Sequence, residues 1–123
     1  MSPKVLIVDD SATVRQQVRL ALTQAGFDVI EANDGLEGLD KINSASDIKA
    51  VICDVNMPRM NGLEMLERCH TQGGPRMPVL MLTTEGKPAL IQKAKEYGAK
   101  GWIVKPFKAD LLVAAVKQLT RAA

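Results

Sequence analysis

Short apolar runs alternate along this chain with longer segments in which apolar residues recur every three or four positions. The runs are rich in β-branched residues, too short for helices of ordinary length and bounded by turn-forming residues, so they predict strands. Five strands are expected, at residues 5–8, 27–32, 50–53, 79–82 and 101–104. The periodic segments predict five helices, at residues 14–25, 36–42, 63–69, 87–97 and 112–119, with a serine-rich loop at residues 43–47.

The predicted strands and helices alternate from one end of the chain to the other. Such alternation with short loops is typical of an α/β domain in which helices cover both faces of a parallel sheet. The runs at residues 5–8 and 50–53 are apolar throughout, which indicates strands buried on both faces. The 123 residues suffice for one core, and no linker or repeat divides them. We expect a single domain over residues 1–123 with no attached effector domain.

Composition narrows the class of protein. Hydrophobic residues make up 46% of the chain and charged residues 24%, and no apolar run approaches the length needed to cross a membrane. Because the first residues also lack the features of a secretory signal, a cytoplasmic location is expected. Cys53 falls in a predicted strand and Cys69 in a predicted helix. These positions favour two buried free thiols over a disulfide or a metal site.

The net charge of +2 is too small to indicate nucleic-acid binding, but it is unevenly distributed. Residues 1–84 contain 8 Lys and Arg against 11 Asp and Glu, whereas residues 85–123 contain 8 against 3. The basic part could bind an acidic partner. Lysines on solvated helix faces explain the same excess equally well, so the charge alone leaves both interpretations open.

Polar side chains follow four of the predicted strands at the point where each strand ends. Asp9 and Asp10 follow the first strand, Asp54 the third, Thr83 the fourth and Lys105 the fifth. The carboxyl ends of the strands in an open parallel sheet meet at one crevice, where ligands bind. Each residue taken alone could equally cap a helix or satisfy a turn. Together they favour a functional site.

The chemistry of this set points to phosphoryl transfer. Carboxylates held close together repel one another, and Mg²⁺ relieves this repulsion because it prefers oxygen ligands and keeps sites open for water or phosphate. Lys105 offers a positive charge and Thr83 a hydroxyl donor to the remaining phosphate oxygens. A carboxylate, with Asp54 as the candidate, would be the nucleophile.

Four motifs carry a resemblance to a known family. They are Val8-Asp9-Asp10-Ser11, Asp54-Val55-Asn56-Met57-Pro58-Arg59-Met60-Asn61-Gly62, Thr83-Thr84-Glu85 and Lys105-Pro106-Phe107. In order and spacing they resemble the receiver domain of two-component response regulators, and among them the stand-alone CheY-like proteins of chemotaxis. The resemblance covers nearly the whole chain. It implies a flavodoxin-like, doubly wound sheet of five parallel strands in the order 2-1-3-4-5, which alternation alone leaves open.

The resemblance also implies a mechanism. Asp54 would accept a phosphoryl group from a phosphohistidine on a partner histidine kinase, with the receiver catalysing the transfer on itself rather than turning over a substrate as an enzyme. Asp10, Asp54 and the Asn56 carbonyl would bind Mg²⁺ directly, and Asp9 would act through water. Lys105 would pair with the phosphoryl group.

Further implications of the resemblance concern the switch and its timing. Thr83 would turn toward the phosphoryl group and draw Trp102 inward, although the indole is larger than the tyrosine or phenylalanine common there. The peptide between Lys105 and Pro106 would be cis. A second set of residues would set the rates of dephosphorylation and access for a phosphatase: Asn56, Thr84 and Glu85.

The partners expected from the resemblance are proteins. An active monomer would bind its target through the fourth helix, the fifth strand and the fifth helix, and a flagellar or other motility component with an acidic segment would suit the basic residues there. A phosphorelay intermediate or phosphate sink without a dedicated output is the alternative.

Two enzymes of similar architecture are more remote alternatives. A flavodoxin needs a phosphate-binding loop after its first strand and aromatic walls, whereas this chain has two acids there and only 3% aromatic residues. A phosphatase with an aspartate nucleophile places its two aspartates two residues apart after the first strand, whereas Asp9 and Asp10 are adjacent.

Overall fold

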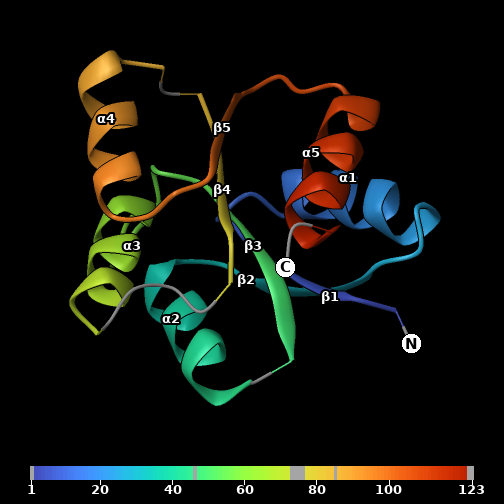
Figure 1. The fold of residues 1–123 in the computed structure, drawn as a ribbon, viewed down its shortest axis with the longest axis horizontal. Coiled ribbons are helices and arrows are strands. Elements are labelled where there is room, and N and C mark those ends of the chain that lie inside the picture. Colours follow the sequence, from blue (N-terminus) through green and yellow to red (C-terminus); the bar gives the residue numbers. More distant parts are fainter. Residues whose placement is uncertain (1, 46, 73–76, 85, 122–123) are drawn as a thin grey trace.

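A five-stranded parallel sheet forms the centre of the protein (Figure 1). The computed structural model describes residues 2–45, 47–72, 77–84 and 86–121. The strands are β1 (Lys4–Val8), β2 (Asp28–Ala32), β3 (Ile48–Cys53), β4 (Val79–Thr83) and β5 (Gly101–Val104). Their order is β2-β1-β3-β4-β5, and every neighbouring pair is parallel. The doubly wound fold and the strand order 2-1-3-4-5 are confirmed.

Five helices cover the two faces of the sheet (Figure 1). They are α1 (Ala12–Gln24), α2 (Gly35–Ser44), α3 (Gly62–Thr71), α4 (Pro88–Glu96) and α5 (Ala109–Arg121). Helices α1 and α5 pack on one face, and α2, α3 and α4 pack on the other. None of the helices within the described ranges combines the length and apolarity needed to span a membrane.

The central strands are buried on both faces, as their apolar composition predicts. Alternate residues of β1 contact opposite layers, because Leu6 belongs to the core under α2, α3 and α4, whereas Ile7 belongs to the core under α1 and α5. Both side chains are 0% exposed. The expected buried thiols are also found, since Cys53 and Cys69 are buried and neither forms a disulfide within the described residues.

The bounds of most elements differ from the prediction by one to three residues, and two of these differences have a clear structural cause. Helix α2 continues to Ser44, into the stretch expected to be a loop, because the Ala45 N–H still bonds the carbonyl of Lys41. Strand β3 begins at Ile48, two residues earlier than expected. Its first residue pairs with Lys4 of β1, and the exposed Lys49 interrupts the apolar pattern that marked the strand. Pairing with a neighbouring strand, which local sequence does not reveal, sets this boundary.

Candidate functional site

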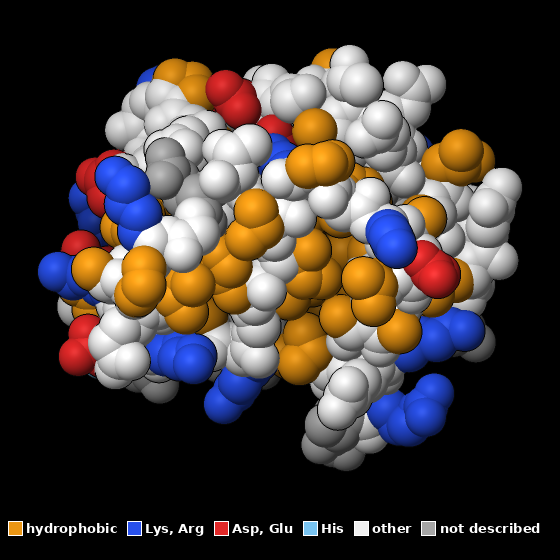
Figure 2. Space-filling model, turned by 90° about the horizontal axis from the view of Figure 1, so that it is seen from above, with side chains coloured by type: hydrophobic (Ala, Val, Ile, Leu, Met, Phe, Trp, Pro, Cys, Tyr) orange, Lys and Arg blue, Asp and Glu red, His pale blue; other side chains and the backbone are white. Residues whose placement is uncertain are grey.

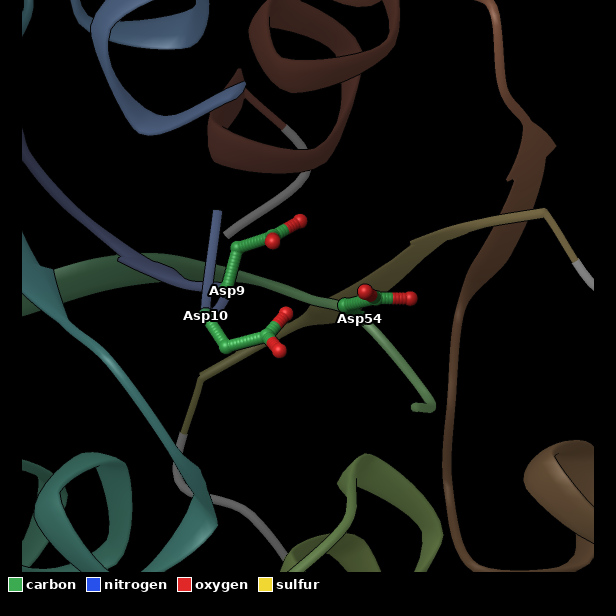
Figure 3. Close-up of side chains that lie close together, drawn as sticks. All are labelled: Asp9, Asp10 and Asp54. Atoms are coloured by element: carbon green, nitrogen blue, oxygen red, sulfur yellow. The ribbon is translucent and has the colours of Figure 1, made fainter. Parts of the chain in front are cut away.

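Three aspartates meet at the carboxyl edge of the sheet (Figure 3). Strands β1 and β3 are neighbours in which Val8 pairs with Cys53, so the residues that follow them lie side by side. The Asp54 N–H donates to the carbonyl of Val8 at 2.9 Å and continues this pairing past the strand ends. One carboxylate oxygen from each of Asp9, Asp10 and Asp54 lies within 4.8 Å of the others. The three acids predicted to form one site therefore do so.

Lys105 reaches this cluster from the far side of β4. It follows β5, where its N–H donates to the carbonyl of Thr83 at 2.8 Å, and its peptide bond to Pro106 is cis as expected. Its ammonium donates to Asp9 Oδ2 at 2.7 Å and to Asp54 Oδ2 at 3.2 Å. The side chain is 14% exposed. Lys105 is thus the internal counter-charge of the site and not a surface lysine.

Burial and charge act in opposite directions on these groups. Burial raises the pKa of Asp9 and outweighs the hydrogen bonds from Lys105 and the Ser11 N–H, while the charge of Asp54 adds to the increase. Burial alone would lower the pKa of Lys105, but its hydrogen bond to Asp9 and the two carboxylate charges outweigh burial and raise it. Lys105 therefore stays protonated, and one ammonium faces three acids.

The donor set fits a hard divalent cation. All three side chains offer carboxylate oxygens, and Mg²⁺ prefers oxygen ligands while keeping some of its water. Asp9 and Asp54 are 0% and 6% exposed, whereas Asp10 is exposed, so the cluster opens to solvent on one side. Asn56 lies in the turn after β3, two residues from Asp54. Its carbonyl as a further ligand stays a prediction.

The carboxylate of Asp54 is held at both oxygens. Oδ1 accepts the N–H of Val55 at 2.7 Å, and Oδ2 accepts Lys105. The turn that follows is unusually close, because a Cβ at Gly62 would stand 1.9 Å from the Asp54 carbonyl oxygen. The Gly62 N–H also donates to the carbonyl of Val55 at 2.9 Å. Only glycine fits at this position. The start of α3 therefore packs directly against the backbone of Asp54.

The predicted switch residues lie on the two strands next to the site. Thr83 ends β4 and is 0% exposed. Trp102 of β5 pairs with Met81, and its partly buried indole packs against the core under α2, α3 and α4. Thr84 is exposed beside Lys105 on the wall of an apolar groove of about 550 Å³ between α1 and the β5–α5 turn. Glu85 lies outside the described residues.

Two arginines near the site make contacts that are absent from the sequence predictions. The Arg15 guanidinium of α1 donates to the backbone carbonyl of Asp9 at 2.6 Å and to Glu31 at 2.9 Å. In the turn after β3, Arg59 has a positive φ of 66° and donates to the buried Asp34 at 2.6 Å. Glu31, which lies inside the apolar strand β2, could have indicated the Arg15 contact, because a half-buried acid requires a cationic partner.

Comparison with known proteins is consistent with this geometry. Residues 5–117 match the family model described as the response regulator receiver domain. The chain belongs to this family. The receiver is 41% identical over 111 residues to a chemotaxis protein CheY homolog of Campylobacter jejuni, which covers 89% of this chain and 85% of that protein.

Solved structures include similar CheY proteins. Chemotaxis protein CheY4 of Vibrio cholerae is 42% identical with a TM-score of 0.88, covering 97% of the receiver and 99% of that chain. A chain from the CheX–CheY–BeF₃–Mg²⁺ complex of Borrelia burgdorferi is 32% identical with a TM-score of 0.86, covering 94% of the receiver and 87% of that chain. The protein is therefore a CheY-like receiver domain of the two-component signalling type.

Proposed function

We propose that this receiver is a phosphorylation switch in which Asp54 accepts a phosphoryl group from the phosphohistidine of a histidine kinase. The observation that carries the proposal is the arrangement around Asp54, whose carboxylate lies within 4.8 Å of Asp9 and Asp10 and accepts the ammonium of Lys105. This arrangement combines a fixed nucleophile, a set of oxygen ligands for a cation and a counter-charge for phosphate oxygens.

In the transfer, a carboxylate oxygen of Asp54 attacks phosphorus while the bond from phosphorus to the imidazole nitrogen of the donor breaks. The products are an aspartyl phosphate and a histidine, which becomes neutral imidazole because its released nitrogen takes one proton from solvent. Bound Mg²⁺ would neutralise charge between the carboxylates and the incoming phosphate oxygens. Lys105, which now contacts Asp54 at 3.2 Å, would move to a phosphate oxygen, and the Thr83 hydroxyl would donate to another.

Water then returns the receiver to its initial state by hydrolysing the aspartyl phosphate. Each receiver gains and loses the phosphoryl group on its own Asp54, so we propose a switch and not an enzyme that turns over a substrate. The rate of hydrolysis would depend on Asn56, Thr84 and Glu85, which follow Asp54 and Thr83 closely in the chain. A partner phosphatase would act at the same residues. The related Borrelia burgdorferi CheY in complex with CheX, BeF₃ and Mg²⁺ supports a role for a cation and a partner protein here.

The kinase would approach over the apolar groove that adjoins Lys105. A histidine side chain is short, so the donor must cover the rim of the site for its phosphoryl group to reach Asp54. The groove walls include Leu20 and Phe107, and the Leu20 side chain is 59% exposed. Burial of such an apolar surface against a partner would be favourable.

The output surface would be formed by α4, β5 and α5. Apolar side chains gather on the face seen from above in Figure 2, which is the side of the molecule where α4, β5 and the start of α5 lie in Figure 1. Val104 is 47% exposed and Leu111 60% exposed. The exposed Lys93 and Lys95 of α4 form no ion pair within the described residues. An acidic segment of a motility protein would complement this surface.

Mass spectrometry of the intact protein tests the proposal. Incubation with Mg²⁺ and acetyl phosphate should add one phosphoryl group to the wild type and none to Asp54→Asn. Asp40→Asn is the matched control, because Asp40 is an exposed acid on α2. A wild type that gains no phosphoryl mass, or an Asp54→Asn variant that gains as much, contradicts the proposal. Turnover of a general phosphatase substrate would instead favour an enzyme.

The beryllofluoride-treated receiver distinguishes an output switch from a phosphate sink. A switch should capture a protein that the untreated form does not bind, whereas a sink need not bind anything new. Failure to capture a new partner from cells that make the protein would argue against the output surface and leave the chemistry at Asp54 intact.

A further inference from the structure

We infer that Arg15 is a positioning residue for the cation site, because it fixes the peptide that joins Asp9 to Asp10. This inference rests on the proposed function, in which Asp9 and Asp10 hold Mg²⁺. The Arg15 guanidinium makes two contacts with different donor atoms. Nη1 donates to the Asp9 carbonyl at 2.6 Å and Nε donates to Glu31 Oε1 at 2.9 Å.

The contact with the Asp9 carbonyl acts on backbone geometry. Fixing this carbonyl fixes the plane of the peptide between the two acids, and therefore the position of the Asp10 Cα from which the side chain leaves the backbone. The same turn is held by the Ser11 N–H, which donates to Asp9 Oδ1 at 2.8 Å, and by the Asp9 N–H, which donates to the Ala32 carbonyl at 3.1 Å. Of these contacts, only that of Arg15 acts on the peptide plane that leads to the exposed acid.

Glu31 holds the guanidinium in place. It lies in β2 opposite Ile7 of β1, so its backbone belongs to the sheet next to the strand that Asp9 follows. The Arg15 side chain is 18% exposed and that of Glu31 32% exposed. The chain of contacts therefore runs from β2 through Glu31 and Arg15 to the acidic turn. Contacts of this kind orient metal ligands without touching the metal.

The sign of the effect separates positioning from simple charge. A guanidinium near three carboxylates repels a divalent cation, so loss of its charge alone would strengthen Mg²⁺ binding. Loss of a positioning contact would weaken it, because the acidic turn would have to be ordered when the cation binds. The two interpretations of Arg15 thus predict changes of affinity in opposite directions.

Arg19 provides a matched control. It lies one helical turn further along α1 and also pairs with Glu31, at 2.7 Å from Oε2, but within the described residues it makes no hydrogen bond to the Asp9 carbonyl. Arg19→Ala therefore removes the same charge and a contact with the same glutamate, while the contact between Arg15 and the acidic turn is retained.

An NMR titration of the full chain with MgCl₂ measures the dissociation constant and identifies the amides that respond. Arg15→Ala should weaken Mg²⁺ binding about tenfold, and Arg19→Ala should change it less than about twofold. Arg15→Lys keeps the charge but cannot make both contacts at once, so it should also bind more weakly than the wild type. This variant keeps the test decisive if Arg15→Ala does not fold.

The outcomes separate this inference from the proposed function. If the wild type binds no Mg²⁺ at Asp9, Asp10 and Asp54, both fail. If the wild type binds Mg²⁺ but the Arg15 variants bind it as tightly or more tightly, or if Arg19→Ala loses as much affinity as Arg15→Ala, the positioning role is refuted and the cation site stands.

Discussion

Replacing Gly62 with alanine should damage the receiver at the residue that carries its chemistry. The added Cβ would lie 1.9 Å from the carbonyl oxygen of Asp54 and 3.0 Å from Cys53 Sγ. A carbon–oxygen contact of this kind normally needs about 3.3 Å, so backbone must move by more than about 1 Å. Movement of Gly62 would also strain its 2.9 Å hydrogen bond to the Val55 carbonyl.

The magnitude follows from these two effects. Overpacking in a rigid core costs about 1–3 kcal/mol, and a weakened buried hydrogen bond adds about 1 kcal/mol, so Gly62→Ala should lower the free energy of unfolding by about 2–4 kcal/mol. Urea denaturation measures this as a lower midpoint with an unchanged slope. The rate of phosphorylation by acetyl phosphate should also fall, because the displaced carbonyl belongs to Asp54.

Gly26→Ala is the control for the general effect of replacing a glycine. Gly26 has a φ of +95°, but a Cβ there meets nothing within 4 Å. Its replacement should cost about 1–2 kcal/mol of backbone strain and leave the phosphorylation rate of the folded protein unchanged. A Gly62→Ala variant that is as stable as the wild type, or whose phosphorylation rate falls no more than that of Gly26→Ala, would refute the reasoning.

Three further predictions address the charged groups. Lys105→Ala should bind Mg²⁺ several-fold more tightly, since an ammonium that competes for Asp9 and Asp54 is lost, yet its phosphorylation should slow about a hundredfold; binding and rates that fall together would contradict this. Burial alone would raise the pKa of Asp34, but hydrogen bonds from a backbone N–H and from Arg59 lower it. The ionised carboxylate therefore stabilises the fold at any pH above the pKa that Asp34 has in the unfolded chain. This stabilisation is lost as the pH falls through the pKa of the folded protein. The stability difference between wild type and Asp34→Asn, measured by urea denaturation, should therefore shrink as the pH falls below about 4, and a constant difference would contradict it. Alanine at Lys93 and Lys95 should weaken capture of an acidic target and its salt dependence while stability changes by less than about 1 kcal/mol; unchanged binding would exclude the electrostatic contribution.

Much of the fold could be predicted because its determinants are local. The apolar runs and helical periodicity mark every strand and helix, and the alternation predicts a parallel sheet. The strand order depends on which strands pair across the sheet, and it came from the resemblance to receiver domains. The start of β3 at Ile48 depends on its pairing with Lys4, a residue more than forty positions earlier. Such boundaries are not encoded in the neighbouring residues.

The candidate site shows the same division. That Asp9, Asp10 and Asp54 meet follows from topology, because the carboxyl ends of parallel strands share one edge. The sequence predicted that Lys105 lies at the same edge of the sheet, but not that it contacts two of these acids. Those contacts depend on how its long side chain crosses β4. Arg15 and Arg59 were missed because their partners are a backbone carbonyl and an acid from distant segments. Sequence spacing does not identify such partners, although a glutamate within the apolar strand β2 indicates that some cation must lie beside it.

Chemical trapping of the modified residue tests the central claim most directly. Borohydride reduces an aspartyl phosphate to homoserine, which peptide mass spectrometry then locates in the chain. After treatment with Mg²⁺ and a phosphodonor, homoserine is predicted at position 54 and at none of the other acids, and chelation of Mg²⁺ should abolish it. Homoserine at Asp9 or Asp10, or trapping at position 54 that is unaffected by removal of Mg²⁺, would contradict the proposed role of this site.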